Sequence, residues 1–133
     1  MERTLVILKP DAVRRKLIGE IISRFERKNL TIIQMKVMNI DKELALLHYQ
    51  HVKKYSFFED MISYITSGPV VVMIISGSNA ISTVRNMVGK TSCHESPIGT
   101  IRGDYGFHPF ENLIHSSDSE ESAGIEIQRF FST

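Results

Sequence analysis

The chain lacks several features that would place it in particular classes of protein. Cys93 is the single cysteine among 133 residues, so no intramolecular disulfide and no multi-thiolate metal site can form. No apolar run approaches the length of a membrane span, and the run at residues 4–8 is too short for the core of a signal peptide. These absences predict a cytoplasmic protein with no membrane partner.

An excess of charge of either sign is also absent. Lysine and arginine number 16 against 15 aspartate and glutamate residues, which gives a formal net charge of +1. A dedicated nucleic-acid binder usually shows a strong basic excess, so this balance predicts no such partner. Small anionic ligands are compatible with it, because a few converging basic side chains are enough to bind them.

What is present is the composition of a globular protein, with 42% hydrophobic and 23% charged residues. The length suits one hydrophobic core, so residues 1–133 are predicted to form a single domain. Strands are predicted from short apolar or alternating runs, at residues 4–8, 31–39, 70–75 and 112–115. Helices are predicted from apolar residues at helical spacing, at residues 17–25 and 80–88, as short helices within residues 41–65, and after the capping cluster 116–119.

This order of elements predicts an α+β fold, a ferredoxin-like βαββαβ sandwich in which helices cover a four-stranded antiparallel sheet. The strand at residues 31–39 alternates as a half-buried strand does. Asp41 and Ser56 are predicted to cap the short helices within residues 41–65. A long loop at residues 89–110 precedes the last strand, and we expect it to be irregular but anchored by its glycines and prolines.

Basic side chains near the ends of these elements are candidates for binding phosphate. Lys9 ends the first strand, Arg85 lies on a predicted helix and Arg102 lies in the long loop. If the three converge, they form a phosphate site, because the guanidinium fork matches the geometry of phosphate oxygens.

His115 is the sharpest candidate for chemistry, since it ends a short strand just before a helix. Glu126 lies at the edge of the apolar stripe of that helix and could orient the imidazole. The alternative is a strand-end histidine bonded to backbone and an exposed glutamate, and residue type and spacing leave both interpretations open. His48 and His51 have no acidic or thiol cluster beside them, so we predict surface or interface residues and not a metal site.

Four segments together resemble the nucleoside diphosphate kinases. They are residues 4–13, 67–71, 99–104 and 112–119 (NLIHSSDS), and they run in the order of that family over nearly the whole chain. The match favours the functional interpretation of His115. It implies the ferredoxin-like fold and a ping-pong reaction, in which a nucleoside triphosphate gives its γ-phosphate to His115 and a nucleoside diphosphate then collects it.

The resemblance also implies a role for each candidate residue. His115 is the nucleophile through Nδ1, Glu126 holds the other ring nitrogen, Ser117 supports that pairing, and Tyr49 and Lys9 lie near the transferred group. The residues that would bind the phosphates, ribose and base are Lys9, Phe57, Met61, Arg85, Thr91, Arg102 and Asn112.

The implied partners are nucleoside di- and triphosphates, both ribo and deoxyribo, with broad base tolerance. A stacked base needs no hydrogen-bond readout, because every base has a π-face. Mg²⁺ would bridge the β- and γ-phosphates, held mainly by the nucleotide and not by protein side chains. The resemblance further implies a homo-oligomer, with a hexamer favoured over a tetramer.

A few positions depart from the family pattern. Ser116 stands where the family usually has glycine, so a positive φ there would be strained. The other departures lie in the long loop and the base-facing segment, at Cys93, Ile98, Pro109 and Glu111.

Two other functions compete with the enzyme. One is a non-catalytic nucleotide-binding or regulatory module on the same scaffold, which the fold alone does not exclude. The other is a single-stranded nucleic-acid binder using aromatic side chains on the sheet. The set of Lys9, Arg102, His115 and Glu126 favours the enzyme, because a pure binder would not require it.

Overall fold

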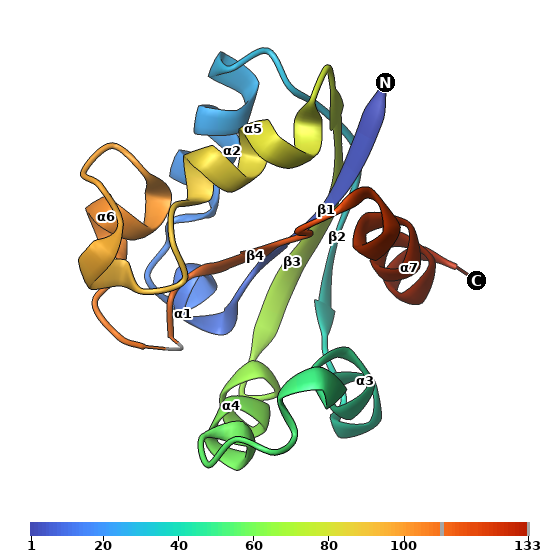
Figure 1. The fold of residues 1–133 in the computed structure, drawn as a ribbon, viewed down its shortest axis with the longest axis vertical. Helices are drawn as coiled ribbons and strands as arrows, with labels where there is room; N and C mark the ends of the chain where they lie inside the picture. The colour runs from blue at the N-terminus through green and yellow to red at the C-terminus, as the bar shows by residue number, and fades with distance from the viewer. Residues whose placement is uncertain (110, 133) are drawn as a thin grey trace.

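A computed structural model describes residues 1–109 and 111–132, and in this part of the chain four antiparallel strands form one sheet (Figure 1). The strands are β1 (Glu2–Leu8), β2 (Thr31–Asn39), β3 (Pro69–Gly77) and β4 (Ile114–Ser116). Their order across the sheet is β2-β3-β1-β4, so the long strands β1 and β3 are central. The predicted α+β, ferredoxin-like arrangement is confirmed.

Helices cover both faces of this sheet. They are α1 (Pro10–Arg14), α2 (Ile18–Arg27), α3 (Lys42–His48), α4 (Phe58–Ile65), α5 (Ala80–Val88), α6 (Ile101–Tyr105) and α7 (Glu120–Phe131), with short 3₁₀ turns at Gln50–Val52 and Cys93–Glu95. Helices α1, α2, α5 and α6 pack on one face, and α3, α4 and α7 on the other (Figure 1). Within the described residues, no helix combines the length and apolar character needed to cross a membrane.

The two faces carry separate hydrophobic cores, because side chains alternate along each strand. On β1, Val6 and Leu8 pack with the helices of the first face, whereas Leu5 and Ile7 pack with those of the second. Both faces of the central strands are therefore covered. This explains why β1 and β3 are nearly continuous runs of buried apolar residues.

Helices α3 and α4 test the two predicted caps. Asp41 caps α3 as predicted, since its carboxylate accepts a hydrogen bond from the Leu44 backbone N–H at 2.8 Å. The prediction for Ser56 is wrong, because α4 begins at Phe58 and the preceding residue, Phe57, caps it without a side-chain hydrogen bond. The local sequence predicted the first cap correctly and placed the second one residue too early.

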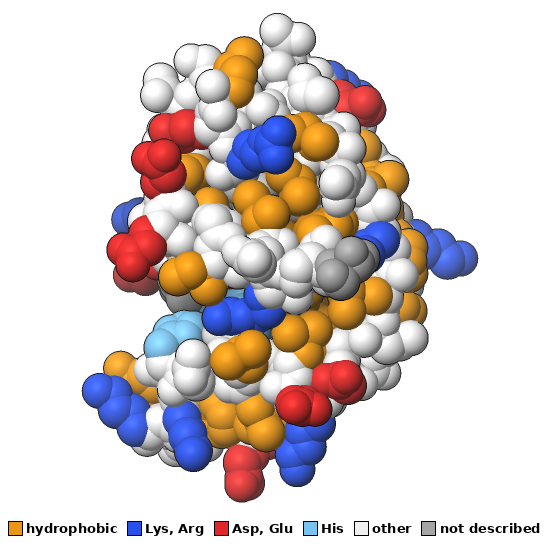
Figure 2. Space-filling model, turned by 90° about the vertical axis from the view of Figure 1, so that its right-hand side faces the viewer, with side chains coloured by type: hydrophobic (Ala, Val, Ile, Leu, Met, Phe, Trp, Pro, Cys, Tyr) orange, Lys and Arg blue, Asp and Glu red, His pale blue; other side chains and the backbone are white. Residues whose placement is uncertain are grey.

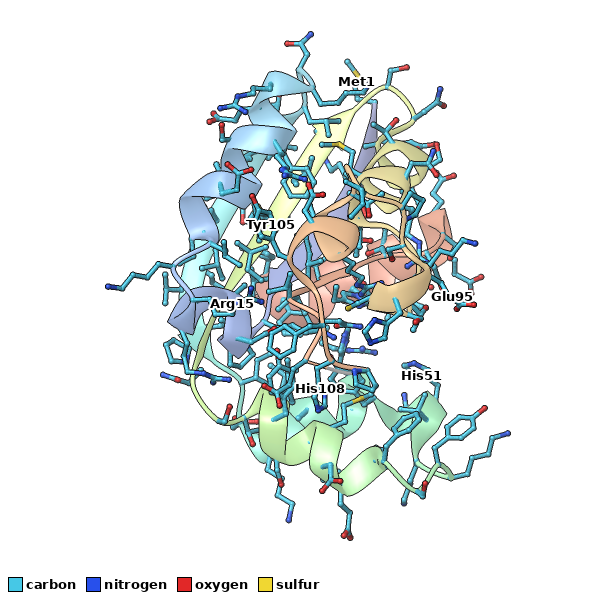
Figure 3. All side chains as sticks on the ribbon, turned by 90° about the vertical axis from the view of Figure 1, so that its left-hand side faces the viewer. Met1, Arg15, His51, Glu95, Tyr105 and His108 are labelled. Atoms are coloured by element: carbon cyan, nitrogen blue, oxygen red, sulfur yellow. The ribbon has the colours of Figure 1, made fainter. Side chains whose placement is uncertain are left out.

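The long loop is more regular than predicted, because it contains α6. Thr100 caps this helix by accepting a hydrogen bond from the Gly103 backbone N–H at 3.0 Å. A Cβ at Gly103 would lie 2.0 Å from the carbonyl oxygen of Pro97, so only glycine allows the loop to pack this closely. Arg15 donates to the carbonyl of Tyr105 at 2.8 Å and ties α6 to the end of α1 (Figure 3).

Strand β2 has its predicted bounds but not its predicted burial. It lies at the edge of the sheet, and Ile33, Met35 and Val37 are 40%, 53% and 68% exposed. The alternation of apolar residues is therefore present, but in the single chain these side chains face solvent and not the core. An exposed apolar edge strand is a surface that natural proteins usually cover.

Ser116 does not adopt the strained conformation that a replaced glycine could have required. The positive φ in this region, 76°, belongs to Leu113, three residues earlier. Ser116 lies opposite Val6 in the ladder, on the face opposite to His115, which pairs with Ile7. Its hydroxyl is buried and has no hydrogen-bond partner among the described residues.

This unpaired hydroxyl predicts that Ser116→Ala stabilises the protein. Removing a buried group without a partner should raise the free energy of unfolding by about 1 kcal/mol, and the melting temperature by roughly 3 °C. Ser117→Ala is the matched control and should lower the melting temperature, because the Ser117 hydroxyl is bonded to Glu126 and to the Leu5 backbone N–H. An unchanged or lower melting temperature for Ser116→Ala would show that the Ser116 hydroxyl does have a hydrogen-bond partner.

Candidate active site

A cavity of about 620 Å³ lies where helices α3 and α4 meet the rest of the molecule. Figure 2 shows histidine and basic side chains together at this junction. His51, which lines the cavity, and His108, in the loop after α6, both lie where that loop approaches α4 (Figure 3). The predicted site residues that line the cavity are Lys9, Phe57, Met61, Arg85, Thr91, Arg102, Asn112, His115 and Glu126.

His115 lies in the middle of β4, which points its ring toward α7. Its Nε2 is 2.9 Å from Oε1 of Glu126, and the Ser117 hydroxyl donates to the same oxygen at 2.7 Å. Burial by itself raises the pKa of Glu126, but the hydrogen bond and charge of His115, with the Ser117 hydroxyl, outweigh burial and lower it. The carboxylate is therefore ionised, so Nε2 of His115 carries a proton and Nδ1 keeps its lone pair.

Lys9 is a buried basic residue at the carboxyl end of β1. Its Nζ donates to Oδ1 of Asn112 at 2.8 Å. Burial, followed by the charge of Arg102, lowers the pKa of Lys9 to about 7, while Asp11 and Cys93 oppose the shift. The side chain is thus poised to gain a proton when an anion enters the cavity.

Arg102 and Arg85 bring two guanidinium groups to the same region. Arg102 is buried and donates to the carbonyls of Lys90, Asn112 and Ile114, at 3.1, 3.3 and 2.6 Å. Burial is the largest cause that lowers the pKa of Arg102, to about 10, so it is charged at neutral pH. Arg85 is exposed and donates to the carbonyl of Ser116 at 3.3 Å.

A tight turn before β4 sets the position of these groups. Leu113 has a positive φ, and its neighbours close the turn with a hydrogen bond from Ile114 N–H to the Asn112 carbonyl at 2.9 Å. The Leu113 N–H donates to Oδ2 of Asp11 at 3.1 Å, and Tyr64 donates to the other oxygen of that carboxylate. Burial is the main cause that raises the pKa of Asp11.

Aromatic and apolar side chains form the other end of the cavity. Phe57 and Met61 line it from the start of α4, and Pro109 lines it from the loop after α6. The ring of Phe57 stacks on Tyr55, with centroids 5.3 Å apart and an interplanar angle of 12°. This end offers a flat apolar surface for a planar ligand group.

Two predicted residues lie behind the cavity lining. Ser117 is fully buried and reaches the site through Glu126. Tyr49 is 6% exposed and packs edge-on against His48, with centroids 4.8 Å apart. Its hydroxyl is buried and has no hydrogen-bond partner among the described residues.

The prediction for His48 is wrong, and Arg129 was not predicted at all. His48 is 5% exposed and lines the cavity, with its ring centroid 4.8 Å from that of His115. Arg129 also lines the cavity, and its spacing of three residues from Glu126 put it on the same helix face. His51 is exposed, as predicted for a surface residue. Potential metal-ligand atoms of His48, His115 and Glu126 lie within 4.8 Å of one another.

Comparison with known proteins identifies close relatives. A family model described as nucleoside diphosphate kinase matches residues 2–133. The chain is 70% identical over 131 residues to a nucleoside diphosphate kinase of Acetivibrio thermocellus, which covers 98% of this chain and 96% of that protein. It is 56% identical over 131 residues to one of Sulfurisphaera tokodaii, with coverages of 98% and 89%.

Solved structures resemble the chain over its whole length. A crystal structure of an apo nucleoside diphosphate kinase from Encephalitozoon cuniculi superposes with a TM-score of 0.97 at 40% identity, covering 100% of this chain and 90% of that one. A halophilic nucleoside diphosphate kinase from Halobacterium salinarum, in complex with CDP, gives a TM-score of 0.96 at 46% identity, with coverages of 99% and 88%.

Proposed function

The chain belongs to the nucleoside diphosphate kinase family, and we propose that its phosphate transfer proceeds through a phosphohistidine on His115. The kinase moves a terminal phosphate between nucleoside tri- and diphosphates. The observation that carries the proposal is the 2.9 Å contact of His115 Nε2 with Glu126, which leaves a lone pair on Nδ1. Family membership and one sheet with two cores also support residues 1–133 as a single kinase domain.

The proposed reaction has two half-reactions. The Nδ1 lone pair of His115 attacks the γ-phosphorus, a bond forms between nitrogen and phosphorus, and the bond to the β–γ bridging oxygen breaks. That oxygen keeps the electron pair and leaves with the nucleoside diphosphate. Glu126 stabilises the positive charge that develops on the ring. A second nucleoside diphosphate then reverses the steps and takes the phosphate.

The basic end of the cavity is proposed to hold the phosphate oxygens. Lys9, Arg85 and Arg102 line this end, with Thr91 beside them, and their charges suit a transition state that spreads negative charge over equatorial oxygens. Tyr49 and His115 both pack against the ring of His48, so the unpartnered hydroxyl of Tyr49 is proposed as a further donor to the transferred group.

A divalent metal ion serves catalysis in this family, and we propose that Mg²⁺ fills that role. Among the described lining residues, Asp118 and Glu126 carry the carboxylates, and Glu126 is already engaged by His115 and Ser117. With so few free carboxylates, Mg²⁺ would be held mainly by the nucleotide phosphates and water. The exposed Asp118 would be the side chain available to contact the ion or its water. The bound ion supplies charge neutralisation at the β- and γ-phosphates.

The apolar end of the cavity is proposed to hold the base. Phe57 and Met61 offer a stacking surface without base-specific hydrogen bonds, which supports broad base tolerance. Asn112 lines the same cavity, where Lys9 donates to its side chain, and we propose that it bonds the ribose, in ribo- and deoxyribonucleotides alike. The CDP bound by the halophilic relative is consistent with a pyrimidine as one substrate base.

The chain is also proposed to act as a homo-oligomer in the cytoplasm. The exposed apolar side chains of edge strand β2 support self-association, and family resemblance favours a hexamer over a tetramer. A free, buried Cys93 supports a reducing compartment such as the cytoplasm.

Incubation with γ-labelled ATP and Mg²⁺ tests the phosphohistidine. We expect one acid-labile phosphate on His115, discharged by GDP or CDP. Because the nucleophilic nitrogen is lost, no labelled adduct should form in His115→Gln, whereas His94→Gln, at an exposed position outside the cavity lining, should label normally. Label mapping and intact mass are the measurements. Nucleotide binding without an adduct on His115 would refute the proposed intermediate.

A second prediction concerns the charge of Lys9. With a pKa of about 7, Lys9 is mostly neutral in the empty site at pH 8, and a bound phosphate should raise that pKa again. Binding of ADP at pH 8 should therefore take up close to one proton, and ADP affinity should fall as pH rises above about 7. Calorimetry in buffers of different ionisation enthalpy measures the uptake.

Lys9→Met is the comparison for this experiment and should abolish the proton uptake. Lys90→Met removes an exposed lysine near the cavity. It is the control, and its proton uptake should be the same as in the unaltered protein. Equal uptake in Lys9→Met and the unaltered protein would assign the proton to another group.

The proposed self-association predicts a third result. Val37→Lys places a charge on the exposed apolar face of β2 and should shift the protein to a smaller species in light scattering, because a buried unpaired charge is costly. Gln34→Lys, at an exposed polar position of the same strand, is the matched control. Light scattering that shows the unaltered protein to be a stable monomer would contradict the proposed self-association.

A further inference from the structure

Arg129 makes a contact that the proposed reaction leaves unexplained. Its NH1 lies 3.2 Å from Nδ1 of His48, which comes from α3, 81 residues earlier in the chain. Arg129 lies three residues after Glu126, so one face of α7 presents a carboxylate to His115 and a guanidinium to His48.

His48 is held firmly against the nucleophile. Its ring meets the ring of His115 edge-on, with centroids 4.8 Å apart and planes 81° apart. The rings of Tyr49 and Phe130 pack on it in the same manner, at 4.8 and 5.3 Å. A second imidazole therefore lies next to the reacting one, in a packed environment that fixes its orientation.

The chemistry of the contact determines the tautomer of His48. A guanidinium has only donors, so Nδ1 of His48 must accept and cannot carry a proton. Burial, followed by His115, lowers the pKa of His48 to about 3, with Arg129 and Lys9 adding to the shift and Glu126 opposing it. The ring is thus neutral at physiological pH, and its one proton lies on Nε2.

We propose that Arg129 is a positioning residue that caps the Nδ1 lone pair of His48, so that of the two packed imidazoles only His115 keeps a nitrogen free to accept a phosphoryl group. Helix α7 gives the two rings opposite partners: Glu126 accepts from His115 and frees its Nδ1, whereas Arg129 donates to His48 and occupies its Nδ1.

The same capping predicts that His48 does not complete a metal site with His115 and Glu126. A metal ligand needs a nitrogen lone pair, and His48 has Nδ1 occupied and Nε2 protonated. Moving the proton to Nδ1 would point it at the N–H of Arg129. The guanidinium also adds a positive charge beside the three ligand atoms, which disfavours a cation there.

The inference rests on the proposed role of His115, but its first test does not depend on phosphate transfer. Long-range ¹H–¹⁵N spectra of protein labelled at the histidine nitrogens report the tautomer of each ring. At pH 7.5 we expect His48 in the unaltered protein to be a single neutral tautomer with the proton on Nε2. Arg129→Met should show a mixture of tautomers, because the donor is lost.

Arg27→Met removes the same charge at an exposed position on α2 and should leave His48 unchanged. An Nδ1–H tautomer of His48 in the unaltered protein, or identical spectra in Arg129→Met, would overturn the proposal while leaving the phosphohistidine intact. The spectrum of the unaltered protein decides the question even if Arg129→Met fails to fold.

Kinetics separate positioning from direct phosphate binding. A positioning role predicts that kcat falls by roughly three- to tenfold in Arg129→Met, with KM for nucleotide unchanged, and that Arg129→Lys restores part of the rate because it keeps a donor. A raised KM with unaltered kcat would assign Arg129 to the nucleotide phosphates and overturn the positioning role.

Discussion

The site depends on one turn being held against the junction of β1 and α1. Leu113 donates its N–H to the carboxylate of Asp11 and accepts at its carbonyl from the Lys9 N–H, at 3.1 and 2.8 Å. These two bonds hold a non-glycine residue in a left-handed conformation that costs energy unless its surroundings enforce it. Asn112 on one side and His115 on the other take their positions from this turn, and so do the phosphate and ribose contacts assigned to them.

Charge is distributed unevenly despite the net charge of +1. Lys9, Arg85, Arg102 and Arg129 all line one cavity, where their mutual repulsion and the burial of Lys9 and Arg102 oppose folding. The molecule limits this cost by hydrogen-bonding each of them to a neutral acceptor: a side-chain amide, backbone carbonyls, or the imidazole of His48. The donors are therefore oriented before a ligand arrives, which reduces the reorganisation that catalysis requires.

The sequence predicted what depends on local pattern and missed what depends on distant partners. The strand at Thr31–Asn39 follows from its alternation, but its exposure does not, because the alternation cannot tell which face is covered. Helix α6 has only five residues and ends beside a glycine, so its apolar residues show no helical spacing in the sequence. The contact between His48 and Arg129 spans 81 residues, whereas His115 and Glu126 lie only 11 residues apart, on the last strand and the helix that follows it.

Arg102 joins three segments that are otherwise held apart, through the carbonyls of the loop, the turn and β4. Only a guanidinium fork can reach all three, since a lysine offers one donor centre. Its substitution therefore loosens the scaffold as well as the ligand site. In a large-scale survey of variants scored by cellular abundance, Arg102 would be grouped with the hydrophobic core, and its proposed contact with nucleotide phosphates would need a separate measurement of binding.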